Sequence, residues 1–376
     1  MGNMLDYIQW RGDLSFAQSP FNEVDNLILS SLSYLNLDGM EEVYGRNALA
    51  LPELAEAFFA RHSEEELSAD KSFVSPVPYM MRDMAKTARF KGCAIRNYVN
   101  EILTKEEQQF SAMEILLEDG SIYVAFRGTD DTIVGWKEDF NLCNGVVPAQ
   151  QRAVEYLEQA GRNTSRMLRV GGHSKGGNLA VFAAAECSRE VREQILEIYS
   201  NDGPGFPREL LEQEKFRKIL PITKRIIPEF SVIGMLLSHE KEPLIVQSSQ
   251  KGILQHDAFS WEVSGPSFVM ADGLNKKAAS FNASLHKWID DMDAEQRSRL
   301  ITDLFSVIEA CGTEYISQVQ EGGLKSFRSM LKKIENFPPE SGIMMQELVN
   351  ALFAGWLERL HQETQERISF LNTAKE

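Results

Sequence analysis

Residues 167–186 read MLRVGGHSKGGNLAVFAAAE, and this stretch decides the fold. Its first five residues have the length and apolar character of a short buried strand, and the alanine-rich run from Asn178 predicts a helix. Between them lies a glycine-rich turn around Ser174. A side chain on so tight a strand-to-helix turn stands clear of the sheet, and Gly172 and Gly176 leave room for the strained backbone. Ser174 is therefore the candidate nucleophile.

Strand and helix patterns alternate on both sides of this turn. Two apolar runs, 112–117 and 121–126, are joined by Glu118-Asp119-Gly120, which predicts a hairpin. Residues 150–160 predict an amphipathic helix, and residues 194–200 predict a further strand. Such alternation is typical of a parallel sheet with crossover helices. We expect an α/β protein with a mostly parallel sheet of the α/β-hydrolase type flanked by helices.

Helical patterns dominate both ends of the chain. Short ones occur between residues 25 and 88, and after Trp261 the pattern is almost entirely helical, at 278–292, 294–311, 323–336 and 342–370. We expect residues 1–265 to form the hydrolase-type domain with its N-terminal helical segment. Residues 266–376 are expected to form a helical C-terminal region, which either packs on that domain or binds a partner.

The charge balance argues against nucleic acid as a partner. The 376 residues carry 39 Lys and Arg against 55 Asp and Glu, a formal net charge of −16. Such a surface repels phosphate backbones and anionic lipid headgroups.

The sequence also predicts a soluble, cytoplasmic protein. Its first residues lack the basic and apolar regions of a secretory signal, and no stretch approaches the roughly 18 apolar residues that span a bilayer. The four cysteines form neither a CxxC pair nor a zinc cluster, and we expect buried free thiols. They are Cys93, Cys143, Cys187 and Cys311.

A serine hydroxyl is a weak nucleophile and needs a general base, usually histidine. Of the six histidines, His173 adjoins Ser174 and is expected to point away from it. Three others lie in helical or polar stretches: His62, His286 and His361. Of the remaining pair, His239 and His256, we predict His256 as the base, because it follows the apolar run 244–246 in the loop expected for this role.

The acid that orients the base precedes it in chain order in this fold. Glu229 follows a short strand-like run and lies between Ser174 and His256, whereas Asp202 follows the strand that ends at residue 200. Asp257 is too near His256 in sequence to be preferred. We favour Glu229 slightly over Asp202, and the alternative stays open.

A second motif, Phe126-Arg127-Gly128-Thr129, ends a predicted strand. In this fold the oxyanion hole takes one amide from the residue after the nucleophile and another from an early strand–loop junction. Lys175 and Thr129 occupy those two places. Taken alone the motif indicates an ordinary turn, but together with Ser174 it favours an oxyanion hole.

These motifs are similar to those of the class 3 lipases, in which one strand ends in F-R-G-T and a later one in G-H-S-x-G-G. Trp136 and Asp139 match the W-x-x-D that follows the first motif. Most of the chain also resembles a bacterial family of class 3 lipase-like hydrolases catalogued as a domain of unknown function. The residues behind this second resemblance are 10–14, 172–180, 201–206, 255–257 and 259–261.

The resemblance implies Ser174 and His256 as nucleophile and base, and Thr129 and Lys175 as oxyanion donors. At the position of the acid in class 3 lipases this chain has Ser231, with Glu229 two residues earlier. Either Glu229 substitutes for that acid, or the triad is weakened to a dyad.

We therefore expect a serine hydrolase of lipase-like character that acts on small-molecule or lipid acyl esters through an acyl-enzyme, with no cofactor and no metal. The apolar segment 206–238 is expected to line an acyl pocket, to act as a lid, or to be buried core. The alternative function is a catalytically weak or inactive fold that serves as a binding or regulatory module.

Overall fold

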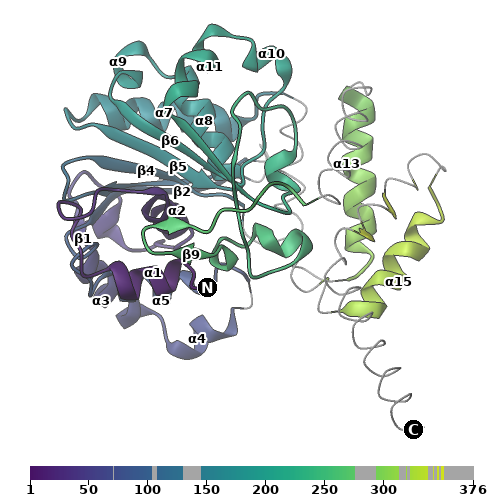
Figure 1. The fold of residues 1–376 in the computed structure, drawn as a ribbon, viewed down its shortest axis with the longest axis horizontal. Coiled ribbons are helices and arrows are strands. Elements are labelled where there is room, and N and C mark those ends of the chain that lie inside the picture. Colours follow the sequence, from purple (N-terminus) through teal and green to yellow (C-terminus); the bar gives the residue numbers. More distant parts are fainter. Residues whose placement is uncertain are drawn as a thin grey trace.

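The centre of the fold is an eight-stranded sheet whose strands lie side by side in the order of the chain (Figure 1). The computed structural model describes residues 1–70, 72–103, 108–129, 145–275, 294–312, 319, 322–337, 342, 345, 346, 349 and 350. The strands are β1 Leu49–Ala50, β2 Ala94–Leu103, β3 Gln108–Leu116, β4 Ile122–Phe126, β5 Leu168–His173, β6 Ile195–Asn201, β7 Thr223–Pro228 and β8 Leu244–Val246. The first four pair antiparallel, and β4 to β8 pair parallel. The sheet is thus mostly parallel and has the α/β-hydrolase form that the sequence predicts.

One face of the sheet is covered by the helices that connect the parallel strands. These are α7 Pro148–Arg162, α8 Lys175–Glu186, α9 Arg189–Arg192, α10 Arg208–Leu211 and α11 Glu214–Ile219. Right-handed crossovers between strands that follow one another in a single direction place all their helices on the same face. Ile122, Val124 and Phe126 of β4 point into this layer.

The N-terminal helices cover the opposite face, which the crossovers leave bare. They are α1 Met4–Arg11, α2 Glu23–Leu32, α3 Leu51–Arg61, α4 Glu64–Ala69 and α5 Val77–Met84. Tyr123 and Ala125, which alternate with the side chains above, belong to this second core, and α2 packs directly on β4 and β5. The predicted N-terminal helices therefore contribute to one of the two core layers of the sheet.

A buried ion pair fixes α2 to the rest of the N-terminal layer. Arg89 and Asp25 are both fully buried and paired, and Arg89 also donates hydrogen bonds to the carbonyls of Leu14, Ser19 and Pro20. Since a buried charge is tolerated only when its polar atoms are satisfied, this arrangement specifies where the 12–20 loop lies.

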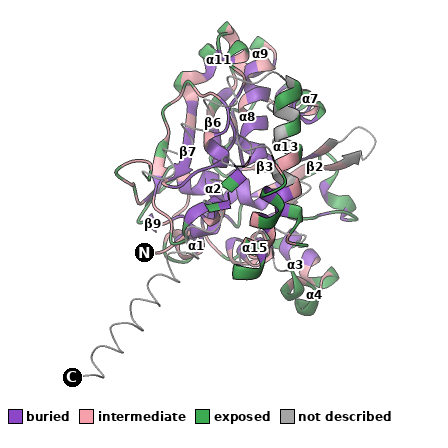
Figure 2. Cartoon of the chain, turned by 90° about the vertical axis from the view of Figure 1, so that its right-hand side faces the viewer, coloured by how far each residue is buried: buried purple, intermediate pink, exposed green. Residues whose placement is uncertain are grey.

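Two helices of the C-terminal region, α13 Ala294–Glu309 and α15 Gly323–Ile334, pack on each other beside the sheet domain (Figures 1 and 2). They confirm the predictions at 294–311 and 323–336. The predicted helix at 278–292 and most of that at 342–370 lie outside the described residues. Between β8 and this region the chain forms η5 Gly252–His256, η6 Ala258–Ser260 and the hairpin of β9 Val263–Ser264 with β10 Ser267–Phe268.

Three further predicted elements and two predicted thiols agree with the structure. The hairpin, the 150–160 helix and the 194–200 strand are confirmed as β3–β4, α7 and β6. Cys93 and Cys187 are buried free thiols as predicted, but Cys311 is only half-buried, because it follows the exposed end of α13. Cys143 lies outside the described residues. Within the ranges given above, no helix has the length and apolar character to cross a membrane, and no group of side chains forms a metal site.

Candidate active site

Ser174 occupies a strained turn between β5 and α8. Its φ of 57° and ψ of −132° lie in a region that residues with a side chain seldom adopt. Such strain costs about 1–3 kcal/mol and persists only where the surroundings enforce it. The Ser174 amide donates to the carbonyl of Asn201 on β6, 2.9 Å away, and its own carbonyl accepts from Gly177. The turn is therefore held from both sides.

The glycines beside Ser174 are required by close backbone contacts. A Cβ atom on Gly172 would lie 2.4 Å from the carbonyl carbon of Gly176, and one on Gly176 would lie 2.1 Å from the carbonyl oxygen of Phe126. Both distances are far shorter than any real Cβ contact. The prediction that these two glycines make room for the turn is thus confirmed. The end of β4, at Phe126, packs directly against the turn.

A buried polar network supports the turn from below. The amide of Asn201 donates to the Gly172 carbonyl at 3.0 Å and to Ser30 Oγ at 3.1 Å. Asn26 donates to Asn201 Oδ1 at 2.8 Å and accepts from the hydroxyl of Tyr123 at 2.7 Å. Since buried polar groups are costly unless satisfied, this network ties α2 to the turn in one arrangement.

Ser174, His256 and Asp202 form a continuous chain of hydrogen bonds. Ser174 Oγ lies 3.0 Å from His256 Nε2, and His256 Nδ1 lies 2.6 Å from Asp202 Oδ2. All three residues are buried, with exposed fractions of 3%, 4% and 0%. Nδ1 bears the proton that faces the carboxylate, so Nε2 is the nitrogen that accepts from the serine hydroxyl. This geometry can transfer the Ser174 proton to His256.

The acid next to His256 is Asp202, which corrects the preference for Glu229. Asp202 follows β6 with a φ of 49°, and its amide donates to Ile226 at 2.8 Å, which turns the carboxylate towards the imidazole. Glu229 directly follows β7 and is half-buried, and its backbone pairs with Val246 and Asn275. Both acids follow a strand in the right chain order, and only the backbone path decides which one reaches the base.

Ser231 supports the acid. Its hydroxyl donates to Asp202 Oδ1 at 2.5 Å, while His256 binds Oδ2. A Cβ atom on Gly234 would lie 2.2 Å from the same Oδ1, so the 231–234 turn closes tightly over the carboxylate. The residue that takes the place of the acid in the class 3 pattern is therefore a hydrogen-bond donor to Asp202.

His173 contacts the base, a relationship that the sequence did not indicate. Its ring lies against that of His256, with centroids 4.6 Å apart and an angle of 35° between the planes. Its Nε2 donates to the His256 carbonyl at 2.8 Å, and its Nδ1 lies 3.1 Å from the hydroxyl of Tyr34. Burial and the neighbouring His256 hold the pKa of His173 well below its usual value. A neutral His173 thus fixes the backbone of the base to the serine turn.

The N-terminal layer also reaches the edge of the site. Phe73, which is half-buried, makes an edge contact with the ring of His256 at 6.4 Å and another with Tyr34 at 6.5 Å. Neither Phe73 nor Tyr34 belongs to a recognisable motif, and only the folding of the N-terminal layer over the sheet brings them here.

Thr129 and Lys175 lie where the two motifs converge. Lys175 begins α8, and both residues are buried, with exposed fractions of 4% for Lys175 and 1% for Thr129. Gly128 touches the serine turn, since a Cβ there would lie 2.4 Å from the His173 carbonyl and 3.1 Å from Ser174 Cβ. The N-terminus of α8 also carries partial positive charge. Trp136 and Asp139 lie outside the described residues.

The apolar segment 206–238 is mainly core. Its side chains at Phe206, Phe216, Ile226, Ile227, Phe230, Val232, Ile233, Leu236 and Leu237 are buried, and Met235 is half-buried. Two of them, Phe206 and Phe216, also line a cavity.

The chain is similar to two solved lipase structures and matches one family model. The Rhizomucor miehei lipase propeptide complex is 16% identical, with 42% of this chain and 57% of that chain covered and a TM-score of 0.31. The M37 lipase is 13% identical, with 89% and 97% covered and a TM-score of 0.36. No curated protein matches significantly. The Mbeg1-like family model matches residues 84–306, more than half of the sequence, and the chain belongs to the Mbeg1-like family.

Proposed function

We propose that the chain is a serine hydrolase that cleaves carboxylic esters through an acyl-enzyme. The observation that carries this proposal is the hydrogen-bonded series from Ser174 through His256 to Asp202, at 3.0 Å and 2.6 Å. Ser174 is the nucleophile, His256 the general base and Asp202 the acid that orients it.

In the first half of the reaction, His256 Nε2 takes the proton of Ser174 as Oγ attacks the ester carbonyl. Asp202 stabilises the imidazolium that forms, and Ser231 helps to hold that carboxylate. The negative charge that develops on the carbonyl oxygen faces the amides of Thr129 and Lys175. The alcohol then leaves with the proton from His256, and the acyl group stays on Ser174.

In the second half, water replaces the alcohol. His256 removes a proton from that water, the hydroxyl adds to the acyl carbon, and the carboxylic acid departs as Ser174 recovers its proton. The sequence of steps balances without any electron transfer and uses only side chains and amides of this chain.

The alternative, a binding module with a vestigial site, drew its support from the lack of an acid at position 231. Asp202 supplies a carboxylate at the base, so that reason no longer applies. Burial of a His–Asp pair beside a strained serine is also expensive, and a binding scaffold gains nothing from it.

The test is labelling of the full-length protein by a fluorophosphonate probe, followed by hydrolysis of p-nitrophenyl esters of increasing acyl length. Labelling is expected to vanish in Ser174→Ala and to slow strongly in His256→Ala and Asp202→Asn. Glu229→Gln is the matched acidic control and should label like the wild type. A wild-type protein that neither labels nor hydrolyses any ester of the series would falsify the proposal.

A further inference from the structure

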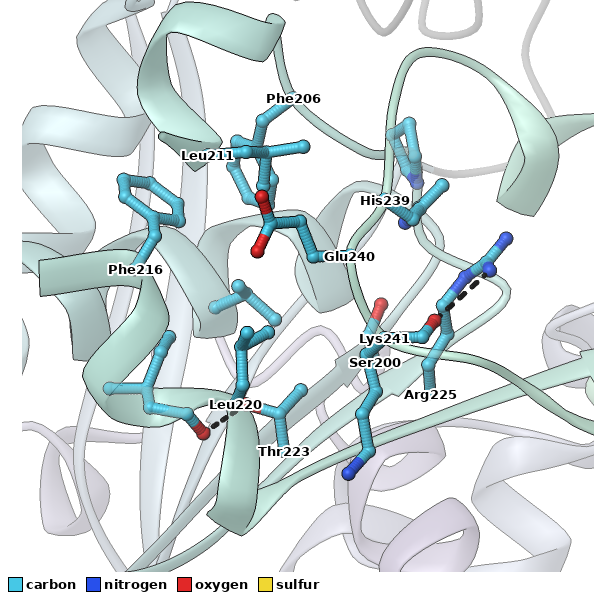
Figure 3. Close-up of a pocket in the computed structure, with 13 residues that line it drawn as sticks. Ser200, Phe206, Leu211, Phe216, Leu220, Thr223, Arg225, His239, Glu240 and Lys241 are labelled. Carbon is cyan, nitrogen blue, oxygen red and sulfur yellow. Dashed lines mark hydrogen bonds between the residues drawn. The ribbon is translucent and has the colours of Figure 1, made fainter. Parts of the chain in front are cut away.

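A cavity separate from the serine site lies on the helix face of the sheet, between α8, α11 and the strands β6 and β7 (Figure 3). Its free volume is about 40 Å³. A water needs roughly 10–15 Å³ of such space, so the cavity has room for about three waters or for a small organic molecule. None of Ser174, His256 and Asp202 is among its lining residues.

One side of this cavity carries a buried cation that no carboxylate of the described residues contacts directly. Arg225 on β7 is 6% exposed, and the acids that act on it electrostatically are Asp202 and Glu242, neither of which forms a salt bridge with it. Its Nη2 donates to the Gly234 carbonyl at 2.5 Å and its Nη1 reaches the Lys241 carbonyl at 3.5 Å, whereas its buried Nε has no acceptor. Burial lowers the pKa of Arg225 to about 10, although Asp202 and Glu242 act in the opposite direction. The cost of burying this guanidinium outweighs the attraction of the two acids, and an anion in the cavity would stabilise it.

The opposite side is apolar. Phe206 and Phe216 meet at a ring-centroid distance of 5.1 Å, and Leu220 also lines the cavity (Figure 3). Such a wall disfavours a strongly hydrated inorganic anion and suits a short alkyl group. Glu240 also lines the cavity. Because this residue is exposed, its carboxylate can rotate towards the solvent when a ligand enters.

We propose that this cavity binds a short-chain monocarboxylate of about the size of acetate to butyrate. The carboxylate accepts a charge-assisted hydrogen bond from the Arg225 guanidinium, and the alkyl group packs on Phe206 and Phe216. His239, whose ring also lines the cavity, flanks the same end (Figure 3). The inference does not depend on ester hydrolysis, although the acid released by that reaction belongs to the same chemical class.

The cavity lies next to the chain segment that carries Asp202. Pro204 and Phe206 line it, and they belong to the segment that carries Asp202. This segment pairs with the 236–238 stretch through hydrogen bonds of Gly205 to Leu236 and of Phe206 to Ser238. An occupant therefore lies directly behind the acid loop.

The test is calorimetric titration of the full-length protein with sodium butyrate, and with butyramide and inorganic phosphate at matched ionic strength. Butyrate is expected to bind at least tenfold more tightly than either comparison ligand. Arg225→Met should weaken butyrate binding at least tenfold, and Val181→Phe, which fills the cavity wall while leaving Arg225 in place, should abolish it. Arg217→Met, an exposed arginine on α11, is the matched control and should bind as the wild type does.

Equal binding of butyrate and butyramide would contradict the role of the Arg225 charge. Phosphate binding as tight as butyrate binding would contradict a monocarboxylate as the ligand. Absence of butyrate binding to the wild type, or unchanged binding in Val181→Phe, would overturn the site itself. Should Arg225→Met fail to fold, the Val181→Phe result decides. The same titration of Ser174→Ala separates the two proposals, since the cavity should keep its affinity there whatever the outcome of the esterase assays. Loss of binding in Ser174→Ala would instead place the carboxylate at the serine.

Discussion

His173 Nε2 donates a hydrogen bond to the backbone carbonyl of His256 at 2.8 Å, and the two tilted rings lie with their centroids 4.6 Å apart. The residue before the proposed nucleophile thus holds the residue proposed as its base. Because a carbonyl can only accept, Nε2 bears the proton of His173, and Nδ1 is left to accept from the Tyr34 hydroxyl at 3.1 Å. The tautomer follows from these two partners.

Replacement of His173 by Phe keeps a ring in this position but removes the donor. We expect kcat for ester hydrolysis to fall about tenfold with little change in KM, equivalent to ~1.4 kcal/mol, since a buried carbonyl without its partner costs about 1–3 kcal/mol. His173→Gln, which offers a side-chain amide donor, should recover part of the loss. An equal loss in both variants, or a change confined to KM, would contradict a role in positioning the base.

The depressed pKa of His173 predicts how stability depends on pH. The unfolded chain takes up a proton below about pH 6.5, whereas the folded protein resists protonation of this buried ring until lower pH. The contribution of His173 is therefore fully present above about pH 6.5 and is lost as pH falls towards the folded pKa, by up to about 1.4 kcal/mol per pH unit. Urea unfolding between pH 7 and 5 measures this slope.

His173→Phe is the control for that slope, because it removes the titrating ring and leaves every other group in place. The wild type should lose stability more steeply than this variant over the same interval. Parallel curves would show that His173 is not the group that resists protonation.

If Asp202 is the acid of the triad, its replacement should lower kcat far more than replacement of Glu229. In Asp202→Asn the amide cannot stabilise the imidazolium and favours the wrong tautomer of His256, so kcat is expected to fall on the order of 10³–10⁴-fold. Glu229→Gln should stay within about twofold of the wild type, since Glu229 follows the neighbouring strand β7, whereas Asp202 is the acid that contacts His256 Nδ1. Steady-state hydrolysis of one p-nitrophenyl ester compares the two variants, and the reverse ranking would return the role to Glu229.

These two acids show which parts of the site can be predicted from the sequence and which cannot. The serine turn and the helix after it are readable because their signals are local: small residues at fixed spacing and a change of apolar period from strand to helix. The base is readable because few histidines follow a strand. Asp202 and Glu229 have the same local signal, and the choice depends on a positive φ at Asp202 and on the Ser231 hydroxyl, which no periodicity encodes.

The N-terminal layer illustrates a second limit. The apolar spacing of residues 27–35 predicts α2 as a helix, but its buried Asn26 and Ser30 acquire their meaning only beside Asn201, which is 175 residues away from Asn26. Likewise β2 carries charged residues and a register shift between Arg96 and Val99, which breaks the alternation that marks a strand. Contacts between distant segments fix these features, and a single sequence does not display them.

The serine turn itself can be tested through its glycines. In Gly176→Ala the new methyl group would lie 2.1 Å from the Phe126 carbonyl oxygen, a backbone atom on a central strand that has little freedom to move. We expect a loss of about 3 kcal/mol in the free energy of unfolding, at the upper end of what overpacking costs, and slower fluorophosphonate labelling as the turn shifts. Gly45→Ala is the matched control, since a Cβ atom there meets nothing within 4 Å and should change stability by less than about 0.5 kcal/mol. Equal urea midpoints for the two variants would mean that the backbone around Ser174 adapts, and the strain at φ 57° would then not be imposed by close packing.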